Sequence, residues 1–508
     1  MFTITSLAFY IFTAAALLLY YLLPKRCQWA VLLLCSIAFV FFGSGIAAFI
    51  FLGIDIAAVY LGAVLTDRAE SAKKRNAFTA VSIVIVTLVL CALKYWNNVA
   101  EWSGGLLTAL GLPVWRCDWV APVGISYFSL SAIGYLLDVN WKVCAAERNP
   151  LKLALLIIWF PALICGPVTR YSDLCGSMFA PHGFDYDKFK SGAYRTLYGL
   201  FKKLVIANRL AIFTSAVFNG QFYEYCGVFF PVAAVLYAFQ IYSDFSGCMD
   251  MMLGVSEMFQ IAMPENFQRP FFSQSMSDFW RRWHMTLGQW AKDYIMYPLL
   301  KSKAFIALGD RSKKIFGKKR GKKVPTYVGM LILWLVLGFW HGGTIRHLFC
   351  CGILLWLFLV SGQICQPLFD KLGSLLHVDK SRFSYKLFAS LRTLLLMCIT
   401  WIFFNSESLA LGFWRLKNSL IEGNWYAVFD RSMYALGLTQ DDFVIVLISF
   451  IIVLAISIMQ EKGIKVREAF EKQGLVFKWA ILLGGIFAII IFGVYGPGYN
   501  AVDFIYRG

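Results

Sequence analysis

Two of the five histidines stand among residues whose types suggest chemistry. His284 ends the tryptophan- and arginine-rich run 280–284. His341 follows the apolar run 331–340 and stands directly before two glycines. An imidazole titrates near neutral pH, so a neutral histidine can take a proton from an attacking hydroxyl. General-base chemistry is therefore one interpretation of His341, and His284 is a second candidate for a functional role. The alternative is that each is a structural histidine, hydrogen-bonded within its own surroundings.

The residues around His284 predict one amphipathic helix over 277–294. Ser277 is a good N-cap, and Asp278 in the first turn complements the helix dipole. One face of this helix carries an aromatic stripe that contains His284: Trp280, Trp283, His284, Leu287, Trp290, Ala291 and Tyr294. The other face is polar: Asp278, Arg281, Arg282, Gln289, Lys292 and Asp293. Such a helix would lie along a membrane interface or dip into it.

The residues around His341 predict a helix end. Two glycines after the histidine break a helix where its side chain can project into a cavity. A helix-end histidine bonded to a carbonyl is the structural alternative. His347 follows after six residues, which is the wrong spacing for one helical face, so no metal site is expected here.

A third candidate is Asp244, in the run Tyr242-Ser-Asp-Phe-Ser-Gly247 at the end of an apolar stretch. Its carboxylate could orient a histidine or pair with an arginine, and a capped helix end at a membrane boundary is the structural alternative. The chain has no G-x-S-x-G, P-loop or G-x-G-x-x-G motif.

The elements that must position these residues are membrane helices. The chain has 508 residues, of which 59% are hydrophobic and 15% charged, against about 25% charged in soluble proteins. About a dozen apolar stretches approach the roughly 20 residues that cross a bilayer. They lie near residues 3–23, 29–42, 46–65, 78–93, 119–137, 153–168, 229–242, 327–340, 348–361, 389–404, 443–458 and 479–493. We therefore expect an all-α polytopic protein with a single membrane domain over 1–508.

The first apolar stretch is expected to be retained, because it lacks the basic start and the small-residue cleavage site of a signal peptide. The thirteen cysteines include no C-x-x-C pair, which argues against zinc or redox chemistry.

The net charge of +18 comes partly from one segment, where ten basic residues and one acid lie between Lys301 and Lys323. The positive-inside rule predicts that 301–326 is a cytoplasmic loop. The same rule predicts an outside N-terminus, cytoplasmic residues 66–76 and an external segment 97–118. Nucleic acid is a poor partner for charge in membrane loops. Anionic lipid, or an anionic acyl donor, fits better.

Taken together, these motifs resemble the membrane-bound O-acyltransferase family, in particular its bacterial branch with the alginate O-acetylation and teichoic-acid D-alanyl transfer proteins. The run Trp280 to His284, with Asp293-Tyr294, Tyr297-Pro-Leu299 and Trp340-His-Gly342, carries the resemblance. Further pieces agree in order: Lys94-Tyr-Trp96, Pro122–Ser126, Phe160-Pro161, Gly166–Arg170, Tyr242–Gly247, Pro264-Glu-Asn-Phe267, Trp401–Phe404 and Phe504-Ile-Tyr506.

The resemblance implies a ring of about 11–12 transmembrane helices, with re-entrant and interfacial helices around a central tunnel. It implies that His341 acts in acyl transfer with His284 as its companion. Residues that would support them or bind substrate are Trp280, Arg281, Arg282, Trp283, Asp293, Tyr294, Asp244, Asn266 and Trp340. The chain departs from the family pattern at Gly343–His347 and at Asn405, where an arginine is frequent, and its basic segment after Leu300 is longer.

The expected function is acyl transfer across the cell membrane, from a cytoplasmic thioester to a hydroxyl of an exported cell-surface polymer or a relay partner protein. Acetyl-CoA is the favoured donor and a carrier-protein thioester the alternative, with no bound cofactor and no metal. D-alanyl transfer to teichoic acid is the alternative within the family. A transporter or flippase, and a scaffold subunit, are the alternatives outside it, although the inverted repeats usual in transporters are not visible.

Overall fold

The computed structural model describes residues 3–117, 119–220 and 226–495, apart from the side chains of Trp102 and Leu106. All the regular elements of this part of the chain are helices, with one isolated antiparallel bridge between Phe267 and Trp283 and no strand. The expectation of an all-α polytopic fold is confirmed. The family-like residues 504–506 lie outside the described part.

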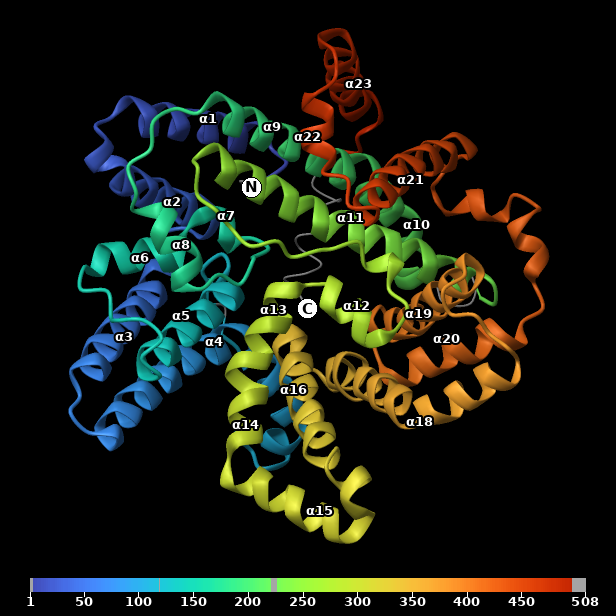
Figure 1. The fold of residues 1–508 in the computed structure, drawn as a ribbon, viewed down its shortest axis with the longest axis horizontal. Coiled ribbons are helices and arrows are strands. Elements are labelled where there is room, and N and C mark those ends of the chain that lie inside the picture. Colours follow the sequence, from blue (N-terminus) through green and yellow to red (C-terminus); the bar gives the residue numbers. More distant parts are fainter. Residues whose placement is uncertain (1–2, 118, 221–225, 496–508) are drawn as a thin grey trace. The chain divides into compact units, whose positions relative to one another are not determined.

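The chain divides into two compact units. Unit 1 comprises Met1–Leu197 and Cys248–Glu265, and unit 2 comprises Tyr198–Gly247 and Asn266–Gly508. Two helices, α9 (Tyr186–Leu200) and α11 (Phe229–Met258), run from one unit into the other (Figure 1).

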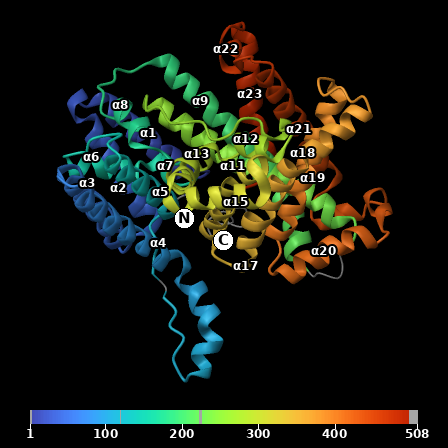
Figure 2. The same ribbon diagram turned by 60° about the horizontal axis from the view of Figure 1, so that its bottom comes forward.

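Most of unit 1 comes from residues 1–197. Its other helices are α1 (Leu7–Leu22), η1 (Lys25–Cys27), α2 (Gln28–Ser44), α3 (Ala48–Arg68), α4 (Ala72–Ala109), α5 (Ile125–Asn140), α6 (Pro150–Ile158), α7 (Phe160–Leu163) and α8 (Tyr171–Met178). The segment 97–118 begins as the end of α4, which projects beyond the other helices of this unit (Figure 2).

Unit 2 holds every histidine-bearing motif discussed above. Its helices are η2 (Phe201–Ala207), α10 (Asn208–Asn219), η3 (Pro270–Phe272), α12 (Met276–Arg282), α13 (Met285–Ala291), η4 (Lys292–Met296), α14 (Tyr297–Lys301), α15 (Lys303–Gly321), α16 (Val324–Gly342), α17 (Ile345–His347), η5 (Leu348–Leu354), α18 (Leu355–Leu375), α19 (Phe383–Phe404), α20 (Leu409–Ile421), η6 (Trp425–Val428), η7 (Ser432–Leu436), α21 (Gln440–Glu461), α22 (Val466–Glu471) and α23 (Leu475–Phe492).

Eight helical stretches of the described chain are long and apolar enough to cross a membrane: Lys25–Ser44, Ala48–Arg68, Ala72–Glu101, Val324–Gly342, Ile345–Leu375, Phe383–Phe404, Gln440–Glu461 and Leu475–Phe492. The other four expected stretches differ. Helices α1 and α5 have only 16 residues each, and the stretch 153–168 breaks into α6 and α7. Helix α11 continues past 242 to Met258 and takes in charged residues. The larger ring around a tunnel stays a prediction.

The basic segment 301–326, which was expected to be a loop, is mostly helix α15. Ser302 caps it by accepting a hydrogen bond from the Phe305 N–H at 3.4 Å. A kink at Gly317 follows from its φ of +76°, a conformation that glycine adopts without strain. The basic residues of this segment are therefore accommodated in a helix.

Helix α21 ends at Glu461, which pairs with Arg282 at the end of α12. A capping box starts α21, because Asp442 donates its N–H to the Thr439 hydroxyl and accepts the Thr439 N–H in return. Val446 and Val453 pack on Ile206 and Leu210 in a buried apolar cluster.

Candidate active site

The helix expected over 277–294 is broken at the histidine. Helix α12 ends at Arg282, His284 adopts a left-handed backbone with φ 48° and ψ 51°, and α13 begins at Met285. The N-cap of α12 is Ser275, whose hydroxyl accepts the Asp278 N–H, so the prediction of Ser277 as the N-cap was wrong. Histidine is one of the residues that tolerate this backbone conformation.

The break is caused by a strand-like neighbour. The segment starting at Asn266 runs beside the histidine, and the Gln268 N–H donates to the Arg282 carbonyl at 2.8 Å. The Met285 N–H donates to the Asn266 carbonyl at 3.0 Å. These bonds satisfy backbone groups that a continuous helix would have paired internally, so the two arrangements compete. Tertiary contact overrides the helical periodicity.

The two predicted faces survive the break. On the aromatic face Trp283, His284, Leu287, Trp290, Ala291 and Tyr294 are buried and Trp280 is half-buried. Trp283 stacks on Phe279 with centroids 5.5 Å apart, and Trp290 contacts Tyr294 at 5.5 Å. Trp280 packs on Trp334 of α16 at 4.8 Å. This aromatic layer joins the His284 segment to the helix that carries His341.

His284 is held by the side chain of Asn266. The Asn266 amide, which is fully buried, places its Oδ1 3.3 Å from Nδ1 of His284. The same oxygen accepts the N–H of Thr286 at 3.1 Å and its hydroxyl at 2.9 Å. Because a carbonyl oxygen can only accept, this network assigns the proton to Nδ1 and leaves Nε2 with a lone pair.

The charge state of His284 follows from its surroundings. Its side chain is buried, and the Phe245 ring meets it edge-on at 4.9 Å. Burial, together with a smaller repulsion from His341, lowers the pKa of His284 to about 3. His284 is therefore a neutral imidazole at physiological pH.

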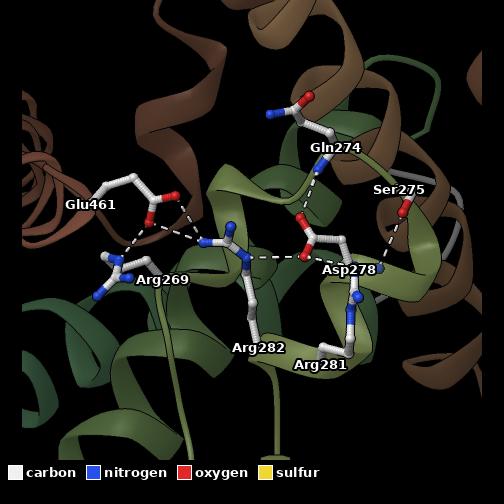
Figure 3. Close-up of polar contacts among 7 residues, drawn as sticks. All are labelled: Arg269, Gln274, Ser275, Asp278, Arg281, Arg282 and Glu461. Atoms are coloured by element: carbon white, nitrogen blue, oxygen red, sulfur yellow. Dashed lines mark hydrogen bonds and ion pairs between the residues drawn. The ribbon is translucent and has the colours of Figure 1, made fainter. Parts of the chain in front are cut away.

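The arginines of the motif have different surroundings (Figure 3). Arg282 lies between Asp278, at 3.2 Å, and Glu461 at the end of α21, at 3.0 Å. Arg269 also reaches Glu461, at 2.6 Å. The Arg281 side chain is 66% exposed and lies 3.4 Å from Asp278. Arg282 thus ties α12 to α21, whereas Arg281 presents its charge outward.

Asp293 is also on the polar side. It accepts a hydrogen bond from the Gln289 amide at 2.9 Å, one helical turn earlier. That contact is local and ties Asp293 to the preceding turn of the helix.

His341 lies in the last turn of α16, half-buried. Helix α16 ends at Gly342, and Gly343 has a φ of +68°, which confirms the helix end predicted from the two glycines. The buried Trp340 has its ring 5.0 Å from the His341 ring and 6.4 Å from the His284 ring. The two candidate histidines are thus gathered around one tryptophan.

Asp244 differs from both of its sequence-based interpretations. It lies inside α11 rather than at a helix end, and its carboxylate pairs with Lys203 at 2.5 Å rather than with a histidine or an arginine. Both side chains are buried. The neighbouring Lys202 donates to the Ser246 hydroxyl at 2.8 Å.

Sequence reasoning missed these two lysines, although a lysine pair inside the apolar run 200–210 is a visible signal, because buried lysines need partners. Among the described residues, no group of three or more His, Cys, Asp or Glu side chains is placed to hold a metal ion.

Comparison with known proteins adds the family. A model described as MBOAT, membrane-bound O-acyltransferase family, matches residues 138–309. A probable alginate O-acetylase of Pseudomonas syringae pathovar tomato is 29% identical over 77% of this chain and 70% of its own length. A peptidoglycan O-acetyltransferase of Helicobacter pylori is 27% identical over 57% of this chain and 55% of its own length. A teichoic acid D-alanyltransferase of Bacillus subtilis is 26% identical over 43% of this chain and 53% of its own length.

The fold and these similarities define a multi-pass membrane enzyme that transfers acyl groups. The chain belongs to the membrane-bound O-acyltransferase family, and it is an O-acyltransferase.

Proposed function

We propose that this enzyme moves an acetyl group from a cytoplasmic thioester, acetyl-CoA in the first instance, across the cell membrane. The acceptor is a hydroxyl of an exported cell-surface polysaccharide or polymer, or of a relay partner protein. Two kinds of relatives named above carry O-acetyl transfer in their names, and one of them matches 77% of the chain. That breadth, together with two histidines gathered around Trp340, is the observation that carries the proposal.

His341 is the general base in this proposal. The acceptor oxygen attacks the thioester carbonyl while the imidazole takes the hydroxyl proton. The C–S bond then breaks, and the departing thiolate receives that proton. His341 suits this role because it lies at a helix end and is partly accessible. General-base catalysis of this kind is typically worth about 10²–10⁴ in rate.

His284 and its surroundings act as the support. A neutral His284 adds no positive charge beside His341, so it does not hinder His341 from accepting a proton. Trp280, Trp283, Tyr294 and Trp340 supply the apolar wall, and Asn266 holds the imidazole. The exposed Arg281 is the motif residue best placed to meet an anionic part of the donor. Arg282, Asp293 and Asp244 support the fold around it.

The orientation follows from charge. The basic helix α15 faces the cytoplasm and the N-terminus lies outside, because basic segments oppose translocation. Single cysteines along 313–323, in a protein without its native cysteines, should resist impermeant thiol reagents in intact cells. Labelling from outside would reverse the orientation and the donor side.

The donor is tested with purified protein in lipid and isotopically labelled acetyl-CoA. Label should move to a polysaccharide acceptor and free thiol should appear in equal amount, with neither in the His341→Gln protein. Turnover supported only by an aminoacylated carrier protein would favour D-alanyl transfer instead. No consumption of either thioester would favour a transporter.

A further inference from the structure

The backbone next to His341 is packed against a second histidine. The His347 ring lies against Gly342, so that a Cβ at Gly342 would come within 2.5 Å of Nδ1 and 2.7 Å of Nε2. Real Cβ atoms do not approach other atoms this closely, so only glycine fits between His341 and this ring. The position of the His347 ring therefore limits where the end of α16 can lie.

His347 is itself fixed through both ring nitrogens. Nδ1 lies 2.7 Å from the Thr344 hydroxyl, and Nε2 lies 3.4 Å from Nη2 of Arg346. A guanidinium can only donate, so Nε2 accepts and the ring proton is on Nδ1. The side chain is buried, and Phe404 meets it edge-on at 5.5 Å. With both nitrogens engaged inside the protein, His347 is placed to hold its neighbours rather than to exchange protons with a substrate.

Arg346 connects this ring to a buried, hydrogen-bonded part of unit 2. Its Nη1 donates to the Ser406 carbonyl, just past the end of α19. Ser406 is fully buried, and its hydroxyl accepts a hydrogen bond from the buried Arg415 at 2.9 Å. Arg415 also donates to the carbonyls of Asn405, at 2.9 Å, and Phe218, at 2.6 Å.

These contacts join two stretches that lie far apart in the sequence. Gly343–His347 and Asn405 are separated by about sixty residues, yet Arg346 bonds to Ser406, directly after Asn405. Arg415 supplies a second guanidinium beside Asn405. The two stretches form one hydrogen-bonded assembly.

We propose that His347 and Arg346 are positioning residues for His341, holding the end of α16 through Gly342 so that the His341 ring is presented to the reacting hydroxyl. The effect on turnover rests on the proposed function, while the packing itself does not. General-base catalysis needs the base within hydrogen-bond reach of its proton, and a misplacement of about 1 Å can cost about 10²-fold in rate.

The first test is a double-mutant cycle on acetyl transfer by the full-length protein in lipid. Gly342→Ala and His347→Ala should each lower kcat roughly 10- to 100-fold and leave the KM for acetyl-CoA unchanged. The double variant should be no slower than His347→Ala, because the ring that the new Cβ would meet is gone. Losses that simply multiply would overturn the proposal. His377→Asn, at an exposed histidine with a φ of +48°, is the matched control and should stay within about twofold.

Milder variants guard against misfolding. Arg346→Gln and Thr344→Val each remove one ring contact and should lower kcat several-fold with normal amounts of protein in the membrane. Wild-type kcat in both variants would overturn the proposal.

The second test does not depend on activity. In protein labelled with ¹⁵N-histidine, the rings of both His284 and His347 should show the Nδ1–H tautomer. One of these two signals should vanish in His347→Ala and shift in Arg346→Gln, while the other stays in place. An unshifted His347 signal in Arg346→Gln would overturn the proposed contact between Arg346 and His347, whatever the turnover. If instead His341→Gln keeps full turnover while the shift is seen, the base assignment fails and the packing stands.

Discussion

His284 and His341 are held in opposite ways. At His284 the residue itself is constrained: its backbone is left-handed, its ring is buried and Asn266 holds its Nδ1. At His341 the residue lies in a regular helical turn with a half-buried ring, and the constraint falls on its neighbour Gly342, packed against His347. The His284 imidazole is enclosed, whereas the His341 imidazole is half-buried and projects from a helix end whose backbone is held by packing.

This difference suggests how the work is divided. An enclosed histidine with a depressed pKa cannot meet substrate easily, but it can pack beside the accessible histidine without adding positive charge. A base must reach its proton, so it needs access, and it needs a rigid backbone to make that access accurate. The following predictions test this division, from the largest expected effect to the smallest.

The largest effect is expected at the accessible histidine. His341→Gln keeps a polar side chain of similar reach and removes titration, so acetyl transfer should fall by about 10²–10⁴-fold. Transfer is measured as label incorporated into acceptor, at equal protein in the membrane and equal donor binding. Near-wild-type turnover would reduce His341 to a packing residue and remove the contrast with His284.

The next effect is on stability at the enclosed histidine. Asn266→Ala leaves three donors without their acceptor, namely His284 Nδ1 and the N–H and hydroxyl of Thr286. A buried unpaired donor costs about 1–3 kcal/mol, so the thermal midpoint of the solubilised protein should fall clearly. Thr286→Val removes only one of these hydrogen bonds and should lower the midpoint less. Equal effects would mean that Asn266 does not organise the site.

A pH effect should separate the two histidines further. The folded pKa of His284 is about 3, below the ordinary value of about 6.5. Between pH 6.5 and about pH 3, His284 is protonated in the unfolded chain but neutral in the folded chain. The contribution of neutral His284 to the free energy of unfolding is therefore complete above pH 6.5. It is lost as the pH falls towards 3, by at most about 1.4 kcal/mol per pH unit.

His284→Asn removes this contribution and keeps a residue that tolerates the left-handed backbone. The midpoint of the wild type should therefore fall more between pH 7.5 and pH 5.5 than that of the variant. Parallel curves for the two proteins would show that His284 is not the neutral, enclosed group described here.

The smallest effect is expected at the outer ion pairs of the His284 segment. Glu461→Gln weakens the contacts to Arg269 and Arg282, which are partly exposed, so about 0.5 kcal/mol of stability should be lost. Turnover should change by less than about threefold. Glu468→Gln, in the exposed pair with Lys465, is the control and should change neither quantity. A large loss of turnover at Glu461 would show that the support of His284 extends to α21.

Several features of the site were predictable because they depend on local residue types. The aromatic and polar faces around His284 sort as the helical spacing predicts, since α12 and α13 keep that spacing on either side of the break. The end of α16 follows directly from Gly342 and Gly343. The choice of His284 and His341 as site residues rested on the same grounds and stays a prediction.

Other features depend on partners far along the chain. The break at His284 arises from Asn266, eighteen residues earlier, which local periodicity cannot reveal. Asp244 was assigned a helix end or an arginine partner because Lys203, on another helix, could not be foreseen as its neighbour. His347 was set aside for its spacing from His341 within one helix, yet the turn at Gly343 folds it back onto Gly342.

The all-α membrane fold follows from residue composition and patterning alone, because in an apolar run of bilayer length a helix pairs every backbone group within its own segment. The family follows from the order of the motifs along the chain. Neither composition nor motif order shows which histidine is enclosed and which is accessible. That depends on hydrogen bonds and ring contacts between segments distant in sequence, whose free energy outweighs local helical preference only once the chain has folded.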